Sequence, residues 1–221
     1  MLVDTVVVAH KVNKKSLLRK CIREGMEMVE FDVTLENGRL VVRHDADVGG
    51  TGFRSYLLKI GYRVVEGRDP LCRPSTLEEF LRLVDGRVGV WLDLKSKGVE
   101  KEVVATARSF GASRIVVSSG FHHMLRYAKE ASKEVTVMLG NVSYRPADPI
   151  KEVELAGADG LSIHYSFVDG DLVEALHSVG YKVAVWTVNS VARAIELAKL
   201  RVDYVITDVP TKVKAALQRY A

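Results

Sequence analysis

The 221-residue sequence is poor in cysteine, with only Cys21 and Cys72. Two cysteines this far apart match neither the ligand spacing of a zinc site nor a disulfide framework. No run approaches the ~18 consecutive apolar residues of a membrane-spanning helix. Residues 1–9 also lack the basic start and long apolar stretch of a signal peptide. We therefore expect a cytoplasmic protein without stable membrane insertion, in which Cys21 belongs to the core.

Basic runs with interleaved aromatic residues are also missing, which argues against nucleic acid as a partner. The mild net charge of +4 suits an anionic small-molecule substrate, although basic side chains scattered over helices equally make a solvated surface. No segment rich in Pro, Gly and Ser divides the chain. A single domain over residues 1–221 is therefore expected.

What the sequence does contain is a repeated alternation of β-type and helical runs. The expected parallel strands begin near residues 5, 28, 88, 114, 135, 160, 182 and 203, and helical runs separate them. Eight such units in a chain of this length predict a (β/α)8 barrel, the TIM-barrel fold. A doubly wound open sheet is the alternative, but no Gly-rich fingerprint follows the first strand.

One stretch departs from this alternation. A strand over Met28–Val33 is followed by a turn containing Asn37-Gly38 and by a second β-type run over Leu40–Arg43. This connection is far shorter than the dozen residues of a parallel crossover, so the two runs must be antiparallel. We expect a β-hairpin excursion after the second barrel strand, and then an irregular surface loop over residues 46–73.

Two helix starts are predicted from their capping residues. In the segment Pro74–Glu79 we expect Ser75 as the N-cap and Glu78 as its capping-box partner. Asp208, followed closely by Pro210, is expected as the N-cap of the final helix. His122-His123 and His177 are interpreted as capping, solvated or structural residues.

Polar residues recur where the expected strands end, and these ends form the active-site face of a barrel. They include His10, Glu30, Asp32, Asp93, Lys95, Ser118, Ser119, His164 and Trp186, with His44 on the hairpin arm. Two acids on one face of an apolar strand are costly to bury without a partner. The sequence therefore predicts a cation or phosphate site at this rim.

Each of these residue types suits a part of phosphodiester chemistry. Glu30, Asp32 and Asp93 supply the oxygen ligands that Mg²⁺ or Ca²⁺ prefers, or else form a structural ion-pair network with Lys11 and Lys95. His10 and His44 can act as an acid and base pair. Lys95 can neutralise phosphoryl charge. Trp186 belongs either to the pocket wall or to the core, and His164 is a further candidate for substrate contact.

Taken in order, several motifs resemble those of the glycerophosphodiester phosphodiesterases over nearly the whole chain. They are Ala9-His10, Glu30-x-Asp32-Val33, Val41-Val42-x-His44-Asp45, Leu92-Asp93-Leu94-Lys95, Val185-Trp186-Thr187-Val188-Asn189 and Thr207-Asp208-x-Pro210. The resemblance implies a (β/α)8 enzyme that cleaves glycerophosphodiesters to glycerol 3-phosphate and an alcohol, through attack by the substrate's own glycerol hydroxyl in many members. It places the function in lipid and glycerol metabolism.

The resemblance also implies residue roles. It assigns a divalent cation to Glu30, Asp32 and Asp93, acid and base catalysis to His10 and His44, phosphate contact to Lys95 and the position of Lys11, and a pocket wall to Trp186. The family's usual Arg-Gly after the first histidine is Lys11-Val12 here, and Lys is a point charge where Arg grips phosphate through two donors. The family's Pro-Glu-Asn-Thr segment is absent, and Asp93 replaces a more common Glu. These departures bear on substrate choice more than on the chemistry.

Two other functions compete with this one. A phospholipase D-like enzyme of the sphingomyelinase D type would act on lysolipids with a similar site, but such enzymes are secreted and disulfide-bearing. A non-catalytic barrel would bind a phosphorylated ligand, but binding alone needs no pair of histidines.

Overall fold

The computed structural model describes residues 5–43 and 74–220. Eight parallel strands close into a barrel, because β1 pairs with both β2 and β9. They are β1 (Val6–Ala9), β2 (Met28–Glu36), β4 (Gly89–Leu94), β5 (Ile115–Ser119), β6 (Thr136–Val142), β7 (Gly160–His164), β8 (Lys182–Trp186) and β9 (Tyr204–Thr207). The predicted (β/α)8 barrel is confirmed.

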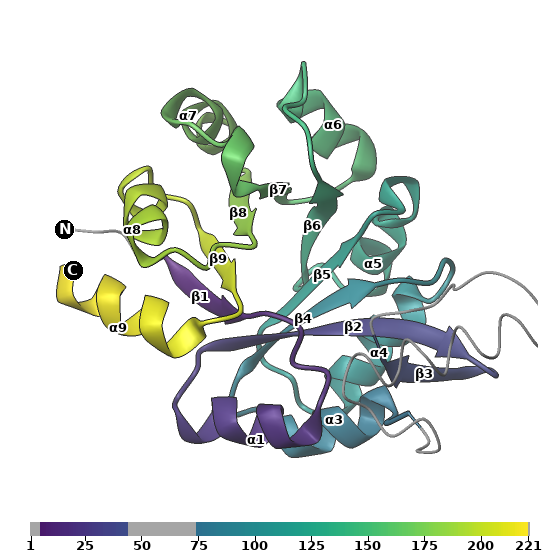
Figure 1. The fold of residues 1–221 in the computed structure, drawn as a ribbon. Coiled ribbons are helices and arrows are strands. Elements are labelled where there is room, and N and C mark those ends of the chain that lie inside the picture. Colours follow the sequence, from purple (N-terminus) through teal and green to yellow (C-terminus); the bar gives the residue numbers. More distant parts are fainter. Residues whose placement is uncertain (1–4, 44–73, 221) are drawn as a thin grey trace, which may run out of the picture.

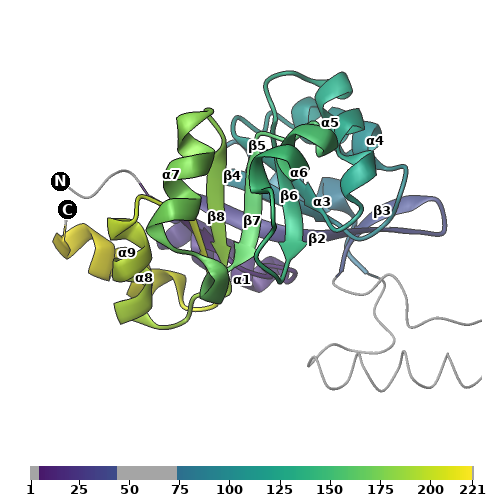
Figure 2. The same cartoon turned by 90° about the horizontal axis from the view of Figure 1, so that it is seen from above.

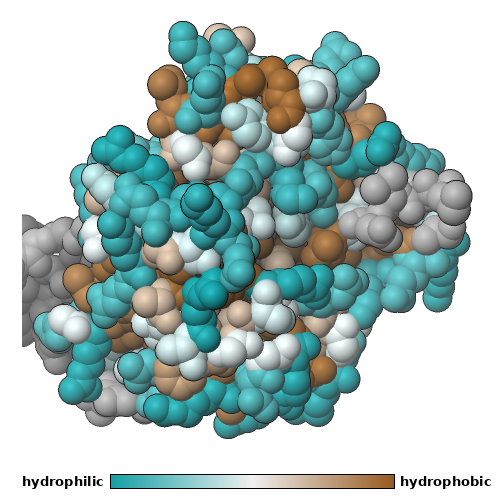
Figure 3. Space-filling model, turned by 180° about the vertical axis from the view of Figure 1, so that it is seen from behind, coloured by the Kyte–Doolittle hydropathy of each residue, from teal (hydrophilic) through white to brown (hydrophobic). Residues whose placement is uncertain are grey.

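Helices surround the strands (Figure 1). They are α1 (Lys15–Arg23), α3 (Leu77–Val84), α4 (Glu100–Ser109), α5 (Arg126–Ala131), α6 (Pro149–Ala156), α7 (Gly170–Ser178), α8 (Val191–Lys199) and α9 (Pro210–Tyr220), with 3₁₀ turns η1 (His122–Met124) and η2 (Tyr165–Phe167). No helix in these two described ranges has the length and apolar character needed to cross a bilayer. The face seen from behind is mostly hydrophilic, with separate apolar spots (Figure 3).

The predicted hairpin is present and extends from one side of the barrel (Figure 2). β3 (Arg39–Val42) runs antiparallel to β2, and Asn37 and Gly38 make the turn with φ of 51° and 72°. β2 continues to Glu36, three residues beyond its predicted end, because Thr34 to Glu36 pair with β3. The surface loop expected over 46–73, together with His44 and Cys72, lies outside the described residues.

Two apolar clusters fill the fold because alternate residues of a strand face opposite sides. The larger cluster lies between strands and helices and includes Phe31, Leu92 and the buried Cys21. A smaller cluster fills the barrel interior, where Trp91 packs edge-on against Tyr204 at a centroid distance of 5.3 Å. Because apolar side chains fill the interior of the barrel, the inward-facing polar side chains lie at the C-terminal ends of the strands.

Two predicted helix boundaries need correction. The capping box of α3 uses Thr76 and Glu79, one residue later than predicted: the Glu79 amide donates to Thr76 Oγ1 and the Thr76 amide donates to Glu79. Ser75 is unavailable because its carbonyl accepts the Val42 amide and ties the segment to β3. The helix expected near 121–132 is divided into η1 and α5, and the His122 ring contacts the Gly140 carbonyl at 2.8 Å.

Candidate active site

The carboxylates of the site owe their placement to strand periodicity. Glu30 and Asp32 lie two residues apart on β2, so both face the barrel interior while Val29, Phe31 and Val33 pack toward the helices. Asp93 is the register partner of Asp32 on the neighbouring β4. These acids therefore meet at the C-terminal end of the barrel.

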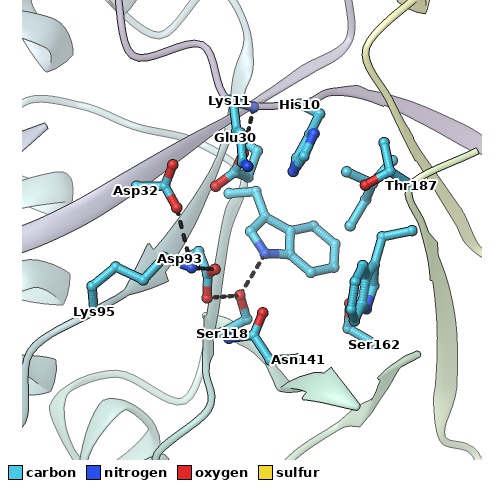
Figure 4. A pocket seen from close by; sticks show the side chains of 13 residues that line it. His10, Lys11, Glu30, Asp32, Asp93, Lys95, Ser118, Asn141, Ser162 and Thr187 are labelled. Carbon is cyan, nitrogen blue, oxygen red and sulfur yellow. Dashed lines mark hydrogen bonds and ion pairs between the residues drawn. The ribbon is translucent and has the colours of Figure 1, made fainter. Parts of the chain in front are cut away.

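A cavity of about 190 Å³ opens at this end. Its lining includes the catalytic candidate His10, the three acids and both lysines (Figure 4). It also includes residues to which the resemblance assigned no role. The full lining is His10, Lys11, Glu30, Asp32, Trp91, Asp93, Lys95, Ser118, Asn141, Ser162, Trp186, Thr187 and Ile206. Trp91 and Ile206 belong to the interior apolar cluster and form the floor.

The three carboxylates are crowded and nearly buried. One oxygen from each of Glu30, Asp32 and Asp93 lies within 4.8 Å of the others. Burial, with repulsion from Asp32 and Asp93, raises the pKa of Glu30 well above its ordinary value, although the Lys11 amide donates to its Oε2 at 2.6 Å. Burial also raises the pKa of Asp93, which Lys95 only partly offsets. Within residues 5–43 and 74–220, the cluster therefore carries three carboxyl groups against a single neighbouring ammonium, that of Lys95.

Lys95 is the one ammonium in contact with this cluster among the residues that the structure describes. Its Nζ lies 3.1 Å from Asp32 Oδ1 and also contacts Asp93 Oδ2. Burial lowers the pKa of Lys95, but attraction to Asp93 and Asp32 outweighs that effect and raises it, so Lys95 carries a full positive charge. Lys11 reaches the cluster through its backbone amide. The ion-pair network considered from the sequence is therefore present between Lys95 and the two aspartates, whereas Glu30 has no direct ion pair within residues 5–43 and 74–220.

The donor set fits a divalent cation. Hard cations such as Mg²⁺ and Ca²⁺ take carboxylate oxygens, and waters or substrate oxygens complete the shell. Glu30, Asp32 and Asp93 present three such carboxylates at one point, with one lysine against them. A double positive charge there would relieve the repulsion that raises the pKa of Glu30. These three residues can hold the metal.

Two neighbouring side chains fix the carboxylates in place. Asn13, on the loop before α1, donates from Nδ2 to Asp32 Oδ2 at 2.6 Å and accepts the Asp32 amide at 3.0 Å. Ser118 on β5 donates to Asp93 Oδ1 at 2.9 Å and accepts from the indole of Trp91 at 2.8 Å. The sequence suggested a site role only for Ser118, since Asn13 lies in a loop without a pattern.

His10 follows β1 and is held by Asp208, which follows β9. Its Nδ1 lies 2.7 Å from Asp208 Oδ1, and Asn189 Nδ2 donates to Asp208 Oδ2 at 2.7 Å. Burial lowers the pKa of His10, and the bond to Asp208 opposes this only in part. The prediction that Asp208 caps the final helix is corrected, because both of its carboxylate oxygens face these side chains.

The opposite wall of the cavity is polar and uncharged. Asn141, Ser162 and Thr187 contribute to it (Figure 4), and Trp186 also lines the cavity. The indole Nε1 of Trp186 is buried and has no hydrogen-bond partner within residues 5–43 and 74–220. Ser162 was detectable in principle, since it shares a strand face with His164 two residues later. Asn141 was not, because it enters through an irregularity of β6, with φ of 59°.

The structure thus brings six predicted site residues into one cavity together with Trp186: His10, Lys11, Glu30, Asp32, Asp93 and Lys95. His164 lies beside the cavity lining, where its ring packs edge-on to Trp186 at 5.5 Å and its Nδ1 contacts Ser166. His177 pairs with Asp203 at 2.9 Å, far from this end of the barrel, as expected for a structural residue. His44 lies outside the described residues.

Comparisons with known proteins agree with this geometry. The model of the "Glycerophosphoryl diester phosphodiesterase family" matches residues 88–212. A phosphodiesterase from Oleispira antarctica, solved in complex with its product sn-glycerol-3-phosphate, is 26% identical, with a TM-score of 0.77 and 96% of each chain covered. No curated protein matches the sequence.

Two further solved structures share the fold at lower identity. A glycerophosphodiester phosphodiesterase from Parabacteroides distasonis is 23% identical over 99% of both chains, with a TM-score of 0.71. The enzyme from Thermotoga maritima is 20% identical, with 96% of this chain and 98% of that chain covered and a TM-score of 0.72.

Proposed function

The chain belongs to the glycerophosphoryl diester phosphodiesterase family and is a phosphoric diester hydrolase, and from this premise we propose that it cleaves glycerophosphodiesters to glycerol 3-phosphate and an alcohol. The observation that carries the proposal is the convergence of three carboxylates, Lys95 and His10 on one cavity. The product-bound relative from Oleispira antarctica supports glycerol 3-phosphate as a product here. We propose that residues 1–221 act as one domain.

In the proposed reaction, Glu30, Asp32 and Asp93 hold a divalent cation, Mg²⁺ or Ca²⁺. When bound, such an ion stabilises the charge that develops on the phosphoryl oxygens. Lys95 lies against the same carboxylates and adds a fixed positive charge for the phosphate. Lys11 carries its charge on a long, exposed side chain at the cavity edge, where it can approach an outer oxygen of the substrate.

His10 serves as one partner of the acid and base pair. Its Nδ1 is engaged by Asp208, so Nε2 is the ring nitrogen available to exchange a proton with a substrate oxygen. His44, which the sequence motif assigns as the second partner, completes the pair. Trp186, whose Nε1 has no hydrogen-bond partner in the described part of the chain, and the neighbouring His164 form the wall that we propose contacts the organic part of the substrate.

The decisive experiment is a substrate panel with the purified, metal-loaded enzyme. Glycerophosphocholine, glycerophosphoethanolamine, lysophosphatidylcholine and bis(p-nitrophenyl) phosphate are each assayed for release of glycerol 3-phosphate or alcohol. We expect turnover of the two glycerophosphodiesters, its loss in excess EDTA and its return with Mg²⁺ or Ca²⁺. Faster turnover of lysophosphatidylcholine would instead favour a phospholipase D-like enzyme. Binding of glycerophosphodiesters without turnover would favour a non-catalytic barrel.

Variants tie the activity to this cavity. His10→Ala and His44→Ala are expected to lower kcat by about 100-fold or more, the usual range for loss of a general acid or base. His177→Ala is the matched control, because His177 also pairs with an aspartate but lies away from the cavity. Full activity in His10→Ala would contradict the proposal. Given its expected reaction and the sequence-based expectation of a cytoplasmic protein, we assign the enzyme to the breakdown of deacylated lipids.

A further inference from the structure

Asp208 sits at the junction of β9 and α9 in a closed set of hydrogen bonds. Its Oδ1 lies 2.7 Å from His10 Nδ1, its Oδ2 accepts from Asn189 Nδ2 at 2.7 Å, and its amide donates to Asn189 Oδ1 at 2.9 Å. Thr207 donates to the same Asn189 oxygen at 3.1 Å. Two backbone segments, after β8 and after β9, therefore fix one carboxylate against one histidine.

The helix that follows does not explain this arrangement. The first amide of the turn, that of Val209, is taken by Thr207 Oγ1 at 3.1 Å. Both oxygens of Asp208 are directed instead to His10 and Asn189. The carboxylate is half exposed, so burial alone does not require these partners. A purely structural cap would use its oxygens on the helix amides.

We propose that Asp208 is a positioning residue that keeps His10 in the Nδ1–H tautomer with Nε2 toward the cavity, and that Asn189 holds Asp208 in register for this task. This inference rests on the proposed function, in which His10 exchanges a proton with the substrate. The Nδ1–H of His10 donates to Asp208, which leaves the lone pair of Nε2 for an incoming proton.

Each proton has a donor and an acceptor, and water is the one further reactant, because it opens the cyclic phosphate that attack by the substrate's own hydroxyl leaves and returns both residues to their starting protonation states. The attacking hydroxyl gives its proton to Nε2 as its oxygen bonds to phosphorus, and the phosphorus–oxygen bond to the leaving alcohol breaks. The second acid and base residue supplies a proton to that alcohol. The imidazolium that His10 becomes is stabilised by the negative charge of Asp208, which keeps its own protonation state throughout.

Other charges also face His10 and bear on its titration. Lys11, the next residue, lowers the pKa of His10, and Asp32 on β2 raises it, while burial lowers it most strongly. Asp208 raises the pKa through its hydrogen bond and its charge. Removal of the Asp208 charge should therefore move the kinetic pKa of His10 to lower pH.

The first test reads the tautomer directly in the resting protein. With ¹⁵N-labelled histidine, we expect the His10 ring of the wild type to show a protonated Nδ1 and an unprotonated Nε2 at pH above its pKa. In Asp208→Asn, the amide can donate to Nδ1, so the proton should move to Nε2. A wild-type His10 with its proton on Nε2, or an unchanged tautomer in Asp208→Asn, would overturn the inference.

The second test is kinetic. Asp208→Asn should lower kcat by about 100-fold or more with a small change in KM, and should shift the pH limb assigned to His10 downward. Asn189→Ala should lower kcat less than Asp208→Asn does. His10 should still carry its proton mainly on Nδ1, but in a smaller fraction of the molecules. Equal kcat and an unmoved pH limb in Asp208→Asn would overturn the role.

Asp203→Asn provides the matched control. Asp203 precedes β9 as Asp208 follows it, and it pairs with His177 at 2.9 Å and accepts the Val183 amide. We expect Asp203→Asn to lower the Tm and to keep the wild-type pH profile. If Asp208 were only structural, Asp208→Asn would behave in the same way. If the wild type fails to hydrolyse glycerophosphodiesters, the proposed function fails, while the tautomer measurement still decides the positioning of His10.

Discussion

Asp32 and Asp93 are register partners on adjacent parallel strands, and the ammonium of Lys95 contacts both. Glu30, two residues before Asp32 on β2, joins them, and no ammonium among the described residues pairs with it directly. Such a cluster of buried charges costs folding free energy, because a buried ion pair seldom stabilises a protein more than apolar side chains of similar volume would. A purely structural role therefore explains it poorly. It is well suited to a protein that receives another cation.

Glu30→Gln should make the metal-free protein more stable at neutral pH. Because the folded-state pKa of Glu30 is raised above its ordinary value of 4.5, the folded protein binds more protons than the unfolded chain, and stability falls as pH rises from about that value through the folded-state pKa. Glutamine removes the charge and still accepts the Lys11 amide. Thermal unfolding in EDTA should show a higher Tm than the wild type at pH 7, and little difference near pH 4.

The same variant should lose the rise in Tm that Mg²⁺, Ca²⁺ or Mn²⁺ gives the wild type. Glu154→Gln, on the exposed face of α6, is the control and should behave as the wild type in both measurements. A lower Tm for metal-free Glu30→Gln at every pH would contradict the explanation.

Lys95→Met should damage both stability and activity. Truncation of the only ammonium in contact with Asp32 and Asp93, among the described residues, leaves two nearly buried carboxylates unpaired, at a cost of about 3 kcal/mol in the free energy of unfolding. Activity should fall by about 100-fold or more through lost phosphoryl stabilisation. Urea unfolding and initial rates measure the two effects. Lys95→Arg should recover more stability than activity, and a Lys95→Met enzyme with unchanged kcat would rule out its role at the phosphate.

Ser118→Ala should destabilise the barrel interior. The hydroxyl links the Trp91 indole to Asp93, so its removal leaves a buried N–H without an acceptor, at a cost of about 1–3 kcal/mol. Asp93 also becomes less well oriented, and metal affinity should fall. Chemical denaturation and calorimetric titration with Ca²⁺ measure these losses. Ser119→Ala, whose hydroxyl contacts the Leu94 carbonyl, should keep metal affinity.

Gly160→Ala should disrupt the barrel wall where β7 meets β8. An added Cβ would lie 2.3 Å from the carbonyl oxygen of Lys182, which is backbone and cannot rotate away. Overpacking of this kind costs about 1–3 kcal/mol or more. Gly170→Ala is the control, since its nearest neighbour would be a Leu200 methyl at 3.9 Å. Similar Tm values for the two variants would show that β7 and β8 can separate without loss.

Much of this molecule follows from period-two patterning. Glu30 and Asp32 share a face because they are two residues apart, and Lys95 reaches Asp93 for the same reason. Eight repeats of strand and helix then close into a barrel, and the inward faces of the strands meet inside it. The Asn37-Gly38 pair predicted the hairpin because both residues adopt positive φ. These inferences need only local chemistry.

The rest depends on which tertiary partner competes for a group. Asp208 before Pro210 has the sequence pattern of a helix cap, and only the fold shows that His10 lies within reach of it. Ser75 and Thr76 are equally good caps by composition, and the bond from Val42 to the Ser75 carbonyl decides between them. Asn141 joins the cavity through the register shift of β6 between Leu139 and Val142, and although Asn tolerates its positive φ well, the sequence does not show which wall that shift makes it face.

The anchoring of the hairpin arm has a consequence for how this barrel can diversify. Val42 bonds to the Ser75 carbonyl at 2.9 Å, and Val41 bridges Thr76, so the chain leaves the described fold and returns to it at almost the same point. Any segment that replaces the one between Arg43 and Pro74 would be attached at two ends whose positions these contacts fix. Doubling its length costs only about 0.6 kcal/mol in closure entropy. The fold can therefore tolerate a change of length between Arg43 and Pro74 while the strands that carry Glu30, Asp32 and Asp93 stay as they are.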